Sequence, residues 1–111
     1  MRADILTDLY QELAQGRAAV LVTVVKTAGS TPRKAGSQML VFGDGGIRGT
    51  IGGGQGEARS ITLAGQALAD KKSSLHHLTM TASVAASEGM ACGGTMDIFV
   101  QYVEPSAHHD Q

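Results

Sequence analysis

Three glycine-bearing segments hold most of the side chains in this sequence that could bind or transform a ligand. They read AGSTPRKAG at residues 28–36, TIGGGQGE at residues 50–57 and EGMACGGT at residues 88–95. A predicted strand or helix flanks each of them, and the ligand sites of open α/β sheets lie where such loops meet at one end of the sheet. We therefore expect the three segments to converge on one site.

The middle segment follows a predicted strand and opens a predicted helix, which is the setting of an anion-binding loop. Free backbone N–H groups and the positive end of the helix dipole would face the ligand. The segment is not a P-loop, because no lysine follows its glycines, and the run from Gly52 to Glu57 does not fit GxGxxG. An anion cradle and a strand-to-helix turn packed too tightly for side chains both remain open.

The first segment offers two hydroxyls and two cations within five residues, at Ser30, Thr31, Arg33 and Lys34. This combination suits phosphate or another oxyanion, because charged donors make the strongest hydrogen bonds to such groups. A solvated surface loop is the alternative interpretation.

The third segment contains the only cysteine, Cys92, followed by Gly93 and Gly94. A thiolate is a soft metal ligand and a strong nucleophile, and glycines leave it accessible. The alternative is an inert core residue, since a catalytic cysteine needs a nearby base and only one of His76 and His77 can face inward from a strand. A single cysteine excludes an internal disulfide framework and a four-ligand zinc cluster of the usual kind.

Length and composition predict one domain with an aliphatic core. The chain has 111 residues, of which 42% are apolar and 4% aromatic, and its formal net charge is −1. This charge gives no global attraction to nucleic acid or to anionic membranes. No apolar run approaches a membrane span, and the first residues do not resemble a signal peptide. We therefore expect a cytoplasmic protein that binds neither nucleic acid nor membrane.

The hydrophobic pattern predicts an α/β (α+β) domain with about five strands in a mixed sheet and two main helices, in the order α-β-β-β-α-β-β. The β-branched run AAVLVTVV at residues 18–25 suits a strand that is buried on both faces. We expect a loop over residues 26–37, a helical turn with a loop over residues 82–94, and a flexible tail over residues 106–111. The expected helices are residues 5–13 and 57–70, and the expected strands are residues 18–25, 38–42, 47–51, 75–81 and 96–102.

Taken in order, the three segments resemble the signatures of the XdhC/CoxI family. GSTPRKAGSQMLVF at residues 29–42, GTIGGGQGEA at residues 49–58 and GMACGGTMDIFV at residues 89–100 carry the resemblance, which spans residues 5 to 105. It implies that residues 1–105 form the family's domain. It also implies a cytoplasmic accessory protein of molybdenum hydroxylases, of the xanthine dehydrogenase or carbon monoxide dehydrogenase type. Such proteins bind molybdenum cofactor transiently, support its sulfuration with a cysteine desulfurase and deliver it to the apoenzyme.

The resemblance also implies which residues bind the cofactor. Glycine amides and Arg33 could hold its phosphate, and Cys92 could contact its sulfur-rich metal end as the one metal ligand. No catalytic residue is implied, because such a factor is not itself expected to be an enzyme. The implied cofactor-binding residues are Ser30, Thr31, Arg33, Lys34, Gly52, Gly53, Gly54, Gln55, Glu57, Cys92, Gly93 and Gly94.

Two departures from the family pattern keep other functions open. Members commonly have a cysteine directly after the glycine triplet, where this sequence has Gln55, which can only hydrogen-bond. Members also carry a Rossmann-like C-terminal domain, whereas this sequence stops at Gln111, so that domain is expected either as a separate partner polypeptide or not at all. The alternatives are a phosphate- or nucleotide-binding regulatory module and an enzyme that uses Cys92 as a sulfur carrier. A homodimer through an exposed sheet edge is also plausible.

Overall fold

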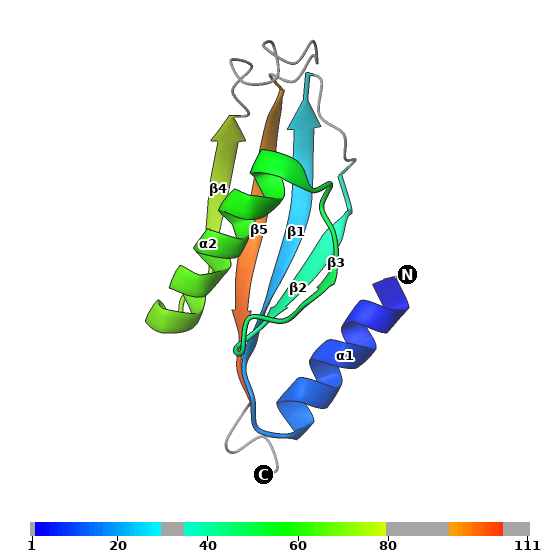
Figure 1. The fold of residues 1–111 in the computed structure, drawn as a ribbon, viewed down its shortest axis with the longest axis vertical. Helices are drawn as coiled ribbons and strands as arrows, with labels where there is room; N and C mark the ends of the chain where they lie inside the picture. Colours follow the sequence, from blue (N-terminus) through cyan, green and yellow to red (C-terminus); the bar gives the residue numbers. More distant parts are fainter. Residues whose placement is uncertain (1, 30–34, 80–93, 106–111) are drawn as a thin grey trace.

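A five-stranded antiparallel sheet with one helix on each face forms the fold (Figure 1). The computed structural model describes residues 2–29, 35–79 and 94–105. The elements follow one another as predicted, and the strand order in the sheet is β3-β2-β1-β5-β4. Their bounds are α1 Arg2–Ala14, β1 Ala19–Ala28, β2 Gln38–Phe42, β3 Ile47–Gly49, α2 Gly54–Asp70, β4 Ser74–Thr79 and β5 Thr95–Val103.

The predicted fold class and element order are confirmed, but the sheet is antiparallel throughout and not mixed. The central strand β1 ends where β5 begins, with Ala28 opposite Thr95, so these two neighbours run in opposite directions. β2 also runs back along β1, with Ala19 opposite Phe42. All four strand pairs are therefore antiparallel, and α2 connects β3 at one edge of the sheet to β4 at the other.

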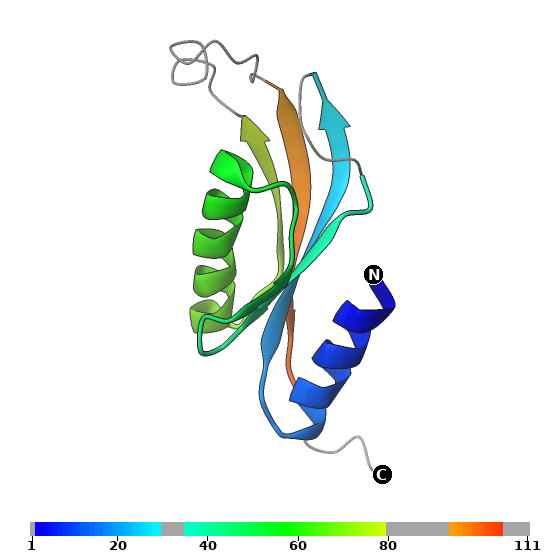
Figure 2. The same cartoon turned by 45° about the vertical axis from the view of Figure 1, so that its right-hand side comes forward.

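The central strand β1 is buried on both faces, as its β-branched run predicts. Val20, Val22 and Val24 belong to the main core cluster, on the face that α2 covers. Ala19 and Leu21 face the other way and pack with Ile5 of α1 in a second, smaller cluster. Figure 2 shows the two helices on opposite sides of the sheet. Alternate residues of β1 therefore contribute to the main core and to the smaller core in turn.

The structure lengthens β1 by three residues relative to the prediction. Residues 26–28 were expected in a loop, but they pair with Asp97, Met96 and Thr95 of β5. The register shifts between Val24 and Lys26, and this β-bulge leaves Val25 46% exposed. A bulge lets a strand continue beyond the point where its regular alternation ends, which the hydrophobic pattern alone does not reveal.

The short strand β3 lies close beneath α1, and Gly49 makes this approach possible. A Cβ at Gly49 would lie 2.7 Å from Ile5 Cδ1 and 2.8 Å from the backbone oxygen of Gln38. The φ angle of Gly49 is also positive, at 78°. β3 was predicted to extend to Ile51, but it ends at this glycine, and the chain then turns toward α2.

Within the described ranges, no helix is both long enough and apolar enough to cross a membrane.

Candidate functional site

The described ends of all three glycine-bearing segments meet at one end of the sheet. Ala28, where the first segment begins, is opposite Thr95, where the third ends, and Thr95 is also opposite Thr79 of β4. Arg59 Nη1, in the second turn of α2, donates a hydrogen bond of 3.0 Å to the backbone oxygen of Thr79. The N-terminus of α2 lies near this end, at the top of Figure 1. The expected convergence therefore holds for the residues that flank the loops.

The loop before α2 depends on three consecutive glycines with positive φ. Gly52, Gly53 and Gly54 have φ angles of 121°, 71° and 65°, a region that L side chains rarely adopt. In the part of the chain that the structure describes, a Cβ built on Gly53 or Gly54 would meet no heavy atom within 4 Å other than those of the adjoining backbone. The backbone conformation therefore explains why glycine is needed here. The alternative, a turn packed too tightly for side chains, is wrong at Gly53 and Gly54. The open space above them would let a ligand approach the backbone closely.

The carboxylate of Glu57 holds this loop in place. It accepts hydrogen bonds from the Thr50 hydroxyl, from the backbone N–H of Ile51 at 3.2 Å and from that of Gly53 at 3.0 Å. The Thr50 hydroxyl oxygen in turn accepts the N–H of Gly52 at 3.0 Å. Gly53 is the N-cap of α2 and has no side chain that could cap the helix. Glu57, one turn further on, accepts the N–H of the N-cap residue itself, which is the bond that the glutamate of a capping box makes.

This network limits what the loop can offer to an anionic ligand. The N–H groups of Ile51 and Gly53 already hold a carboxylate of the chain itself. A phosphate placed at the same point would meet the negative charge of Glu57 at short range. If backbone amides of this loop bind phosphate, they must therefore be amides other than those of Ile51 and Gly53.

Half of the twelve residues implied to bind cofactor lie in the described part of the chain. Gly52, Gly53, Gly54, Gln55 and Glu57 form the loop and the start of α2, and Gly94 is buried directly before β5. The other six lie outside the described residues, so their placement stays a prediction. These are Ser30, Thr31, Arg33, Lys34, Cys92 and Gly93.

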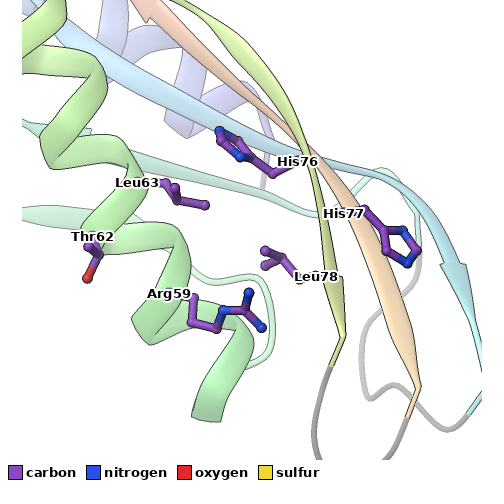
Figure 3. A pocket seen from close by; sticks show the side chains of 6 residues that line it. All are labelled: Arg59, Thr62, Leu63, His76, His77 and Leu78. Atoms are coloured by element: carbon purple, nitrogen blue, oxygen red, sulfur yellow. The ribbon is translucent and has the colours of Figure 1, made fainter.

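A pocket of about 260 Å³ lies beside this end, between α2 and the edge strand β4. Arg59, Thr62 and Leu63 of α2 and His76, His77 and Leu78 of β4 line it (Figure 3). In Figure 3 the His76 ring lies on the α2 side of β4 and the His77 ring lies on the other side.

The two histidines therefore face in opposite directions, as expected for neighbours on a strand. His76 Nε2 lies 2.6 Å from the Ser74 hydroxyl oxygen, and His77 Nδ1 lies 2.5 Å from Asp97 Oδ1.

Arg59 is the residue that sequence reasoning missed. It was not selected because it stands alone on a helix, outside the three glycine-bearing segments. The available signal was its position five residues after the glycine triplet, on a helix that the triplet itself starts.

In the described ranges no group of three or more histidine, cysteine, aspartate or glutamate side chains could hold a metal ion. Cys92 lies outside these ranges, so its role as a metal ligand stays a prediction.

Comparison with known proteins supports the resemblance drawn from the motifs. A family model described as the XdhC and CoxI family matches residues 12–79, which include the first and second signatures. The uncharacterized protein YqeB of Escherichia coli (strain K12) is 39% identical over 97 residues, which are 87% of this chain. A crystal structure described as a xanthine dehydrogenase from Bacillus halodurans superimposes on 87% of this chain with a TM-score of 0.68 and 25% identity.

Both of these similar proteins are much longer than this chain. The matched region is 18% of the Escherichia coli protein and 30% of the Bacillus halodurans chain. The similarity therefore concerns one part of each of them.

Proposed function

Because the chain belongs to the XdhC and CoxI family, we propose that it is an accessory domain of molybdenum hydroxylases that binds molybdenum cofactor and assists its maturation or insertion. The likeness to a structure described as a xanthine dehydrogenase supports a connection with this class of enzyme. The apoenzyme would be the partner that receives the cofactor. A cysteine desulfurase and a separate Rossmann-type protein would be further partners in its sulfuration.

The single observation that carries the proposal is the open, glycine-lined space at the start of α2. Among the described residues, apart from the adjoining backbone, no heavy atom lies within 4 Å of where a Cβ on Gly53 or Gly54 would stand, so a flat ligand could lie directly against the backbone. The ends of β1, β4 and β5 meet at the same end of the sheet. A site between strand ends and a helix N-terminus is a common position for cofactors that carry phosphate.

The charge of Glu57 indicates how the cofactor would divide among the three segments. The backbone amides of Ile51 and Gly53 already bind the carboxylate of Glu57, so this part of the wall suits an uncharged ring better than a phosphate. The pterin part of the cofactor is such a ring. Its phosphate would then be held by the cations of the first segment, Arg33 and Lys34. The cofactor itself would supply the molybdenum and its sulfur ligands, and Cys92 is the one thiol of the chain that could contact them.

The experiment is co-elution of the protein with released cofactor on a sizing column. Molybdenum and pterin should both elute with the wild-type protein, and Arg33→Glu should reduce the retained amount by about tenfold because it reverses a phosphate-binding charge. Lys72→Glu, an exposed charge reversal beyond the end of α2, serves as the matched control and should retain the cofactor. The proposal fails if neither molybdenum nor pterin is retained where a two-domain relative retains both.

A second function is favoured by one specific residue, Gln55. The amide cannot replace the thiol that family members commonly have after the glycine triplet, so the domain would bind a nucleotide or another phosphate ligand and would take no part in sulfuration. A thermal-shift screen separates the two functions, because a bound ligand raises the melting temperature of the protein. Stabilisation by a nucleotide, and none by the cofactor, would establish the second function in place of the first.

A further inference from the structure

The edge strand β4 lacks the features that usually protect a sheet edge from pairing. β4 is the last strand of the sheet on its side, so in the described chain only β5 pairs with it. Its six residues, SLHHLT, include no lysine, no carboxylate and no proline, and its register with β5 runs without a bulge. Natural edge strands are commonly kept unpaired by such residues, by bulges or by being very short. The opposite edge, β3, is only three residues long and carries Arg48.

The pocket between α2 and β4 lies directly beside this open edge. α2 packs chiefly on β5 and β1, so its outer side chains Arg59, Thr62 and Leu63 lie beside β4 and leave a space there. His76 and Leu78 point from β4 into the same space (Figure 3). A sixth strand added at β4 would therefore turn every second side chain toward the face of the sheet on which this pocket lies, because alternate residues of a strand share a face.

The size of the pocket suits side chains of a peptide better than a separate small molecule. Its volume of about 260 Å³ lies below the range of about 300–1,000 Å³ that is typical of small-molecule sites. Leu63 and Leu78 give the pocket an apolar part, and Arg59 and His76 supply polar groups (Figure 3). One apolar and one polar side chain of an added strand would fill it.

The charges around the edge favour an acidic partner. The lining residues include no carboxylate, and Arg59 contributes a guanidinium that is held beside the edge by its hydrogen bond to Thr79. A guanidinium has five N–H donors, so one bond to a carbonyl leaves it able to bind a carboxylate as well. Lys71 and Lys72 precede β4 and add positive charge at its other end, where Asp70 is the acidic neighbour.

The same charges disfavour a second copy of this chain at the edge. Two β4 strands paired antiparallel would bring Lys71 and Lys72 of one copy toward the Thr79 end of the other. Arg59 stands at that end, so like charges would lie close together. Like-charge contacts of this kind suppress a pairing.

We propose that β4 is a docking edge for an extended acidic segment of a partner protein, which adds to the sheet as a sixth strand. Main-chain hydrogen bonds to β4 supply the affinity, and the pocket with Arg59 selects the charge of the segment. This inference does not depend on cofactor binding, since it uses only the α2–β4 side of the domain.

Synthetic peptides test the edge and the charge separately. The probe is an acetylated peptide of about eight residues, long enough to span β4, with alternating valine and threonine and a glutamate at each end. One comparison peptide has lysine in place of glutamate, and another keeps the glutamates but carries N-methyl groups on alternate amides. Fluorescence anisotropy should show the acidic peptide binding about tenfold more tightly than the basic one, and the N-methylated peptide losing affinity by at least about tenfold, since it cannot complete the strand pairing.

Protein variants identify the residue that selects charge. Arg59→Glu should weaken the acidic peptide by about tenfold and strengthen the basic one, and Arg59→Lys should lie between wild type and Arg59→Glu. Lys26→Glu reverses an exposed charge on β1, two strands away, and should change either affinity by less than about twofold. Thermal melts of each variant confirm that it is folded. In amide NMR spectra of the full chain, the peptide should shift the signals of residues 74–79.

Several results would overturn the proposal. These are equal binding of the acidic and basic peptides, unchanged binding of the N-methylated peptide, or no saturable binding up to about 1 mM. Sedimentation velocity tests whether a second copy of this chain occupies the edge instead. A concentration-dependent dimer with β4 amides protected from exchange would assign the edge to a second copy and not to an acidic segment.

Discussion

Glu57 should contribute more to the stability of the domain than an ordinary helix residue, because it holds the loop before α2. Its carboxylate accepts two backbone N–H groups and the Thr50 hydroxyl. Hydrogen bonds to charged groups contribute about 1.5–3 kcal/mol each. The loop is partly open to water, so for each backbone bond we take about 1 kcal/mol, which is below that range and is the usual value for a hydrogen bond between uncharged groups. A carboxylate near the start of a helix adds about 0.5 kcal/mol, and the better helix propensity of alanine returns a similar amount.

Glu57→Ala should therefore lower the free energy of unfolding by about 2 kcal/mol, which corresponds to a melting temperature lower by about 10 °C for a domain of this size. Glu57→Gln keeps an acceptor but loses the charge, so we expect a loss of about 1 kcal/mol. Urea unfolding followed by circular dichroism measures both values. Gln66→Ala, at an exposed position on the same helix, is the matched control and should change stability by less than about 0.5 kcal/mol.

Hydrogen exchange shows whether the stability is lost at the loop itself. The amides of Ile51 and Gly53 should exchange faster in Glu57→Ala at temperatures where the sheet amides are still protected, because these two lose their acceptor. The reasoning is refuted if Glu57→Ala unfolds at the same urea concentration as Gln66→Ala. It is also refuted if the exchange of these two amides stays the same while the whole domain loses stability.

Four further predictions concern other parts of the fold. Gly49→Ala should destabilise the protein by about 2–4 kcal/mol in urea unfolding, because the new Cβ would lie 2.8 Å from a backbone oxygen and the residue has a positive φ. A loss of stability below about 1 kcal/mol would contradict this account. Gly65→Ala, at an open position inside α2, should instead stabilise by about 0.5–1 kcal/mol in the same assay, and a destabilisation would count against the open space there. Leu40→Ala should cost about 2–4 kcal/mol, because Leu40 is fully buried in the smaller core, and a cost like that of a surface substitution would show that this core adds little. The hydrogen bond from Arg17, at 2.9 Å, holds the pKa of Glu12 below its ordinary value. The ionised carboxylate therefore stabilises the fold at pH values above the ordinary pKa of about 4.3, and this stabilisation is lost as the pH falls through the pKa of the folded state. Glu12→Gln should therefore flatten the acid side of a stability-against-pH curve, and an identical slope for the wild type and the variant would argue against the ion pair.

The sequence predicted the elements of this fold well where local pattern determines them. The β-branched run of β1 indicates burial on two faces, and the structure confirms it with one helix on each side. The pattern did not reveal where β1 ends, because Lys26 continues the strand beyond a bulge and polar residues carry no periodic signal there. It also did not reveal that all strand pairs are antiparallel, since direction depends on contacts between segments far apart in the sequence.

The candidate site was predicted in part. The three segments were identified from residue types, and their described flanks lie at one end of the sheet. The structural role of Glu57 could not be derived in the same way, because its partners are backbone N–H groups that only the positive φ angles of the loop bring together. Arg59 became visible only once β4 was placed beside α2. In each case the missing information was a contact between segments, which residue types do not specify.

The position of β1 in the middle of the sheet has a consequence for how the protein is made. β1 can pair with β2 soon after both strands are synthesised, but its other neighbour is β5, with Val24 opposite Ile98. At elongation rates of about 5–20 residues per second, β1 waits several seconds before that neighbour exists. During this interval one long side of the most apolar strand has no partner, and unpaired apolar edges of this kind drive aggregation. We therefore expect the yield of soluble protein to improve at low temperature or with added chaperones, even for variants whose final stability is unchanged.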